Sequence, residues 1–64
     1  MIARDIPDEY AYRLTERLAL LGFFSEADTP MFVVSRVKRE IHEEIKGRWP
    51  NAYAEAVETG RMTP

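Results

Sequence analysis

The chain has 64 residues, of which 45% are hydrophobic and 31% charged, with a formal net charge of -2 and no cysteine. This composition is typical of a globular domain, and it excludes disulfides, thiolate metal sites and an overall basic field that would recruit nucleic acid. A chain of about 60 residues buries only ~60% of the surface that its unfolded form exposes. We therefore expect one small domain over residues 1–64, stabilised by self-association or by a partner protein.

No apolar run approaches the ~20 residues that a membrane span needs. The first ten residues, MIARDIPDEY, also lack the apolar segment of a signal peptide. We therefore expect a cytoplasmic protein that does not enter a membrane.

The first helix is predicted over residues 6–21. Asp5 suits the N-cap and Pro7 the first turn. The apolar residues then recur at helical spacing: Tyr10, Ala11, Leu14, Leu18 and Leu21. Gly22 is a natural left-handed residue after the helix, and Phe23 would then pack back onto the last turn in a Schellman cap.

The second helix is predicted over residues 30–46. Thr29 supplies a capping hydroxyl and Pro30 a first helical residue, and Gly47 is expected to end the helix. The apolar positions of this segment are Met31, Val33, Val34, Val37, Ile41 and Ile45. The β-branched run at residues 32–34 also fits a strand, but periodicity that continues through the segment favours a helix.

A third helix is predicted over residues 50–59, and residues 61–64 are expected to fray. Between the first two helices, Ser25 and Asp28 have the spacing of a capping box and indicate a short turn. The predicted fold is therefore all-α, an antiparallel hairpin of the first two helices with a short third helix, and we expect it to be dimeric.

The sequence contains no pattern that predicts an enzyme or a metal site. Acidic residues surround the single histidine on the second helix, but they lack the HExxH or ExxH spacing that places ligands on one helix face: Glu40, His42, Glu43 and Glu44. Glycines are isolated, and the two serines have no plausible base partner. We expect no catalysis and no cofactor, and a surface or interface position for His42.

Positive charge gathers locally on the second helix. Residues 34–48 hold five basic and three acidic side chains. The spacing predicts the ion pairs Arg36–Glu40 and Arg39–Glu43 along an exposed face, and the interspersed glutamates would repel phosphates. We therefore do not expect binding to nucleic acid.

One stretch resembles a known family. The segment IPDEYAYRLTERLALLG, followed by a second helix, is similar to ribbon-helix-helix repressors, whose first helix often opens at a Pro-acid pair and closes at Leu-Gly. The resemblance covers residues 2–46, although the segment before Ile6 is shorter and the inter-helix stretch longer than in that family. It implies a DNA-binding transcriptional regulator, with Arg4 on the strand that reads bases. This is our alternative function.

The chain has more large apolar groups than a three-helix core of this size accommodates: three Phe, three Tyr, one Trp and three Met. Any one of them is expected in the core, but the set predicts an exposed patch, which marks a protein interface. We predict a small protein–protein interaction module that acts as a regulator, antagonist or adaptor, similar in size and class to phage-encoded inhibitors of host machinery. The predicted anchors and rim residues are Phe24, Phe32, Trp49, Tyr53, Arg36, Arg39 and Arg48.

Overall fold

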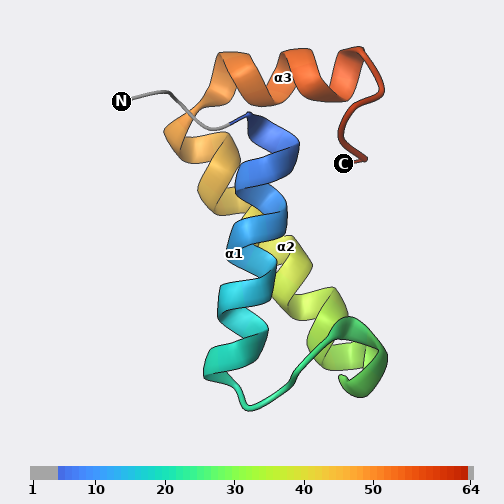
Figure 1. The fold of residues 1–64 in the computed structure, drawn as a ribbon. Helices are drawn as coiled ribbons and strands as arrows, with labels where there is room; N and C mark the ends of the chain where they lie inside the picture. Colours follow the sequence, from blue (N-terminus) through green and yellow to red (C-terminus); the bar gives the residue numbers. More distant parts are fainter. Residues whose placement is uncertain (1–4, 64) are drawn as a thin grey trace.

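The computed structural model describes residues 5–63 as four helical elements (Figure 1): α1 (Ile6–Leu20), the 3-10 helix η1 (Glu26–Asp28), α2 (Met31–Arg48) and α3 (Pro50–Glu58). The helices α1 and α2 form an antiparallel hairpin, and α3 lies across the end where α1 begins and α2 ends (Figure 1). Over these residues there is no strand, which confirms the all-α prediction, and each predicted helix boundary lies within two residues of the observed one. None of the described helices has the length and apolar character to cross a membrane.

The core lies where the three helices meet. Its buried apolar residues come from every α-helix and from the segment after α3: Ile6, Leu14, Leu18, Val37, Ile41, Ile45, Tyr53, Ala56 and Met62. On α2 they recur at every fourth residue, which gives one apolar stripe facing α1 and α3. Ile41 and Ile45 are both 0% exposed, and burial of such a side chain stabilises the fold by about 1.5–3 kcal/mol.

The end of α1 is a Schellman cap, as predicted. Gly22 has a φ of 93°, and its N–H donates to the carbonyl of Ala19 at 3.0 Å. The N–H of Phe23 donates to the carbonyl of Leu18 at 2.9 Å, and the Phe23 ring packs against the core. A left-handed residue is needed at this position, and glycine adopts that conformation without a steric penalty.

The start of α2 differs from the prediction in its cap. Pro30 is the N-cap residue, and the hydroxyl of Thr29 donates to the carbonyl of Ser25 at 2.7 Å instead of capping α2. The Ser25 hydroxyl in turn donates to the Asp28 carboxylate at 3.2 Å, which confirms the short turn. Thr29 is buried, so its hydroxyl must find a partner, and the nearby carbonyl that closes η1 supplies it.

The prediction that Gly47 ends the second helix is wrong. The helix α2 continues through Gly47 to Arg48, and the chain leaves helical geometry at Trp49, with φ -132° and ψ 67°. Trp49 precedes Pro50, whose ring disfavours helical backbone in the residue before it. The proline therefore determines the break, and it also supplies the first residue of α3.

Residues 61–63, part of the segment expected to fray, lie against the rest of the fold, and residue 64 lies outside the described residues. Gly60 has a φ of 75°, and the N–H groups of Arg61 and Met62 both donate to the carbonyl of Ala56, at 2.8 and 3.1 Å. Met62 is buried in the core. The Arg61 guanidinium donates to the carboxylate of Asp5, so this N-cap residue of α1 makes an ion pair rather than a side-chain cap.

Candidate functional site

Five large apolar side chains lie exposed around the connection between α1 and α2, and we call them the tip surface: Leu20, Leu21, Phe24, Met31 and Phe32. Their exposed fractions run from 52% at Leu21 to 97% at Phe24. In Figure 1 this connection is at the end of the hairpin opposite α3. The predicted anchors Phe24 and Phe32 therefore lie at one end of the molecule, together with three residues that the prediction omitted.

The exposure of Phe24 follows from the cap that ends α1. The Schellman geometry returns Phe23 to the core, and the next residue then points out of it. The α1 core stripe of Leu14 and Leu18 likewise leaves the exposed Leu20 outside its spacing. The geometry of the cap thus places two consecutive phenylalanines in different environments: Phe23 packs against the core and Phe24 is 97% exposed.

A groove of about 290 Å³ lies between α1 and α2, beside the tip surface. Its apolar lining comes from both helices: Leu21, Phe32, Val33 and Val37. The charged side chains that line it are Arg17, Arg36 and Glu40. Leu21 directly follows α1 and Phe32 lies in the first turn of α2, so the groove brings two residues of the tip surface together across the hairpin.

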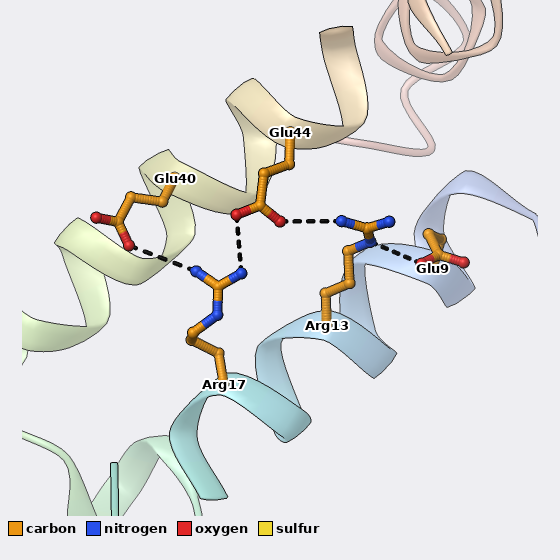
Figure 2. A network of polar contacts seen from close by, with 5 residues as sticks. All are labelled: Glu9, Arg13, Arg17, Glu40 and Glu44. Carbon is orange, nitrogen blue, oxygen red and sulfur yellow. Dashed lines mark hydrogen bonds and ion pairs between the residues drawn. The ribbon is translucent and has the colours of Figure 1, made fainter. Parts of the chain in front are cut away.

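A network of ion pairs fixes α1 against α2 next to this groove (Figure 2). Arg13 contacts Glu9 at 2.7 Å and Glu44 at 2.9 Å. Arg17 contacts Glu44 at 2.8 Å and Glu40 at 3.5 Å. The hydrogen bonds from Arg17 and Arg13 hold the pKa of the Glu44 carboxyl below its ordinary value. The network therefore joins the two helices that carry the tip surface.

The two ion pairs predicted along the second helix are absent from the described residues, whereas one pair with the same spacing is present on α1. It joins Glu9 and Arg13, four residues apart. Neither Arg36–Glu40 nor Arg39–Glu43 occurs between residues 5 and 63. Glu40 turns instead to Arg17 across the hairpin, which leaves the exposed Arg36 beside the groove.

The other two predicted anchors lie at the opposite end of the molecule and face inward. Tyr53 is buried, with its hydroxyl 2.8 Å from Nδ1 of His42. Trp49 is half-buried and packs against the core. The guanidinium carbons of Arg13 and Arg48 lie 5.5 and 5.1 Å from the centroid of the Trp49 ring, within the range of cation–π attraction.

The seven predicted partner-binding residues therefore do not form one surface. Phe32 and Trp49 are separated by nearly the whole of α2, about 25 Å at 1.5 Å per residue. Phe24 and Phe32 belong to the tip surface, with Arg36 beside it. The exposed Leu20, Leu21 and Met31 could have been found from the sequence, because a single core stripe leaves no room for them.

The ribbon-helix-helix resemblance concerns the two helices and the segment before them. Arg4, the residue it places on a base-reading strand, lies outside the described residues. The connection between the helices spans ten residues, from Leu21 to Pro30, and contains η1. The chain matches no protein-family model, no curated protein and no solved structure.

Proposed function

We propose that the chain is a small protein–protein interaction module that regulates, antagonises or links another protein through its tip surface. The observation that carries this proposal is the set of exposed apolar side chains at the hairpin tip, above all Phe24 at 97% and Phe32 at 76% exposure. Exposed apolar residues that gather in one place, with charges beside them, mark interaction sites.

The tip surface has the composition of an interface centre. Two aromatic rings, two leucines and a methionine supply apolar area, and burial of each such side chain contributes about 1.5–3 kcal/mol before the costs of association. Arg36 lies beside the groove and offers a charged rim contact. Binding would act by steric occlusion: the hairpin end covers a site on the partner.

We also propose that the chain forms a homodimer when no other partner is present. A domain of this size rarely has a core that contributes more than ~3–5 kcal/mol, and here the chain leaves its most apolar segment in water. A second copy would cover the same side chains, which makes the dimer and the complex with a partner alternatives that compete for the tip surface.

Sedimentation velocity tests the surface directly. The wild-type chain should sediment as a dimer at tens of micromolar, and the double variant Phe24→Ser/Phe32→Ser as a monomer with an unchanged helical circular dichroism spectrum. Tyr12→Ser is the matched control, because Tyr12 is a half-exposed aromatic residue outside the tip surface. A wild-type chain that remains monomeric would remove the dimer from the proposal.

Affinity capture from the native host, read by mass spectrometry, tests the partner. The wild-type and Tyr12→Ser chains should capture the same protein, and the Phe24→Ser/Phe32→Ser chain should not. Undiminished capture by a folded double variant would exclude the tip surface as the binding site. Loss of capture on Arg48→Ser instead would assign binding to the α3 end of the molecule.

A further inference from the structure

A second cleft, separate from the tip surface and its groove, lies between α2, α1, α3 and the segment after α3. It has a volume of about 500 Å³, and its lining shares no residue with the tip surface. Most of its wall is one face of α2. Four hydroxyl groups line it, one from each of these parts of the chain: Tyr10, Ser35, Tyr53 and Thr63. We call it the donor cleft.

The charge of the donor cleft is opposite to that of the chain. Lys38, Arg39 and Lys46 line it together with a single carboxylate, that of Glu43. The lining residues alone sum to +2, and the Glu26 carboxylate that pairs with Lys38 lowers this to +1, on a chain whose net charge is -2. Every lining residue except Glu43 carries a group that can donate a hydrogen bond.

Two of these cations are available to an external ligand. Lys38 is engaged with the Glu26 carboxylate at 2.7 Å. Arg39 and Lys46 are exposed, and neither takes part in an ion pair within residues 5–63. A guanidinium offers a planar pair of donors to an oxyanion, and an ammonium adds a point charge.

His42 forms part of the cleft wall and is fixed by its neighbours. Its ring centroid lies 4.9 Å from that of Tyr10 on α1 and 5.8 Å from that of Tyr53 on α3. Its Nδ1 contacts the Tyr53 hydroxyl. Burial and the charge of Lys38 lower the pKa of His42, and Glu43 acts weakly in the opposite direction. The imidazole is therefore harder to protonate than that of an ordinary histidine, and its place in the cleft wall makes it a reporter for a charge that enters the cleft.

We propose that the donor cleft binds a small molecule that carries a phosphate group. A phosphate group presents several acceptor oxygens and close to two negative charges. Arg39 and Lys46 can each contact one of these oxygens, and with the lining hydroxyls they offer more donor groups than the two oxygens of a carboxylate can accept. The hydroxyls of Tyr10, Ser35 and Thr63 can donate to the remaining oxygens. Walls from three helices suit a compact group rather than a long polymer.

Proton NMR of the imidazole of His42 tests this proposal, because the chain has one histidine and its resonances stand alone. Sodium pyrophosphate is the probe, added at constant ionic strength and neutral pH. We expect a saturable shift with half-saturation at about 1 mM. Arg39→Gln and Lys46→Gln should each raise that concentration by about three- to tenfold. Arg36→Gln is the control, because it removes the same charge from α2 outside the cleft. It should change the half-saturation concentration by less than about twofold.

Four results would overturn the proposal. They are the absence of a saturable shift, equal weakening by Arg36→Gln, an equal response to sodium acetate, and saturation by a double-stranded oligonucleotide at a far lower concentration than pyrophosphate. The last result would assign the cleft to nucleic acid. Phe24→Ser/Phe32→Ser should bind pyrophosphate as the wild type does, so this test stands apart from that of the tip surface.

Discussion

The Tyr53 hydroxyl on α3 and Nδ1 of His42 on α2 lie 2.8 Å apart and join the third helix to the hairpin. Tyr53 is buried, so its hydroxyl needs this partner. The contact also explains why an aromatic residue that resembles an interface anchor in the sequence belongs to the core. The two side chains are eleven residues apart, and the contact engages the buried Tyr53 hydroxyl within the fold.

Stability should fall as the pH drops below the ordinary pKa of histidine. Burial and Lys38 lower the pKa of His42 in the folded state, so the unfolded chain binds more protons at that site. The stabilisation that neutral His42 gives the fold is complete above 6.5, the ordinary pKa that this side chain has in the unfolded chain. It is lost as the pH falls below 6.5 toward the lower pKa of the folded state. Urea unfolding between about pH 8 and pH 5 measures it.

The matched variant for this prediction is His42→Gln, which has no titrating group at the site. Its stability should change less than that of the wild type over the same interval. The Glu44 carboxyl titrates below its ordinary value of 4.5 and so falls outside this window. Parallel pH profiles for the wild type and His42→Gln would contradict the assignment.

Removal of one methyl group from the centre of the core should be measurable. Ile41 is 0% exposed, and Ile41→Val should lower the free energy of unfolding by about 0.5–1.5 kcal/mol. The control is Val34→Ala on the same helix, at a position that is only partly buried. We expect a smaller loss there, determined by urea denaturation monitored at 222 nm, a wavelength at about the helical minimum. Equal losses would place the centre of the core elsewhere.

The interhelical ion pairs should contribute modestly and respond to salt. Glu44 bridges Arg13 and Arg17, and Glu44→Gln should lower the free energy of unfolding by about 0.5–1 kcal/mol, because solvent reaches these side chains. The loss should shrink in 1 M salt, where the Debye length is about 3 Å. Glu43→Gln removes a neighbouring exposed charge and should have little effect. A loss that salt leaves unchanged would show that packing, not charge, is responsible.

Two glycine-to-alanine substitutions should change the free energy of unfolding in opposite directions. Gly47 lies inside α2 with no atom within 4 Å of an added Cβ, so Gly47→Ala should raise the free energy of unfolding by about 0.5–1 kcal/mol. Gly60 has a φ of 75°, and Gly60→Ala should lower it by about 1–2 kcal/mol. Thermal unfolding of the two variants and the wild type in the same buffer checks both expectations. A stabilising Gly60→Ala would mean that the cap after α3 is not needed.

The sequence predicted those parts of the fold that depend on spacing along the chain. The apolar repeat through Ile41 identified the buried face of α2, and Gly22 with Phe23 identified the cap of α1. Gly47 was misleading because a glycine is compatible with both a helix interior and a helix end, and only Pro50 distinguishes them. Met62 is buried because a turn after α3 brings it back to the core. The spacing of apolar residues along the sequence does not predict that turn.

The candidate sites were predictable to different degrees. Exposure at Phe24 and Phe32 was expected from the surplus of apolar side chains over core positions. The inward position of Tyr53 depends on His42, a residue of another helix, and no local pattern indicates that contact. The donor cleft joins three helices, so its positive charge is visible only after the chain has folded.

The cap that places Phe23 inside and Phe24 outside has a consequence for how this segment tolerates length changes. Since the two residues are identical, deletion of either one yields the same shortened chain, with a phenylalanine still following Gly22. That ring would occupy the packed position, because the hydrogen bonds of the cap are counted from the glycine. The core would keep its ring and the tip surface would lose its most exposed one. A one-codon deletion would therefore test the proposed role of the tip surface while the packed ring of the core is kept.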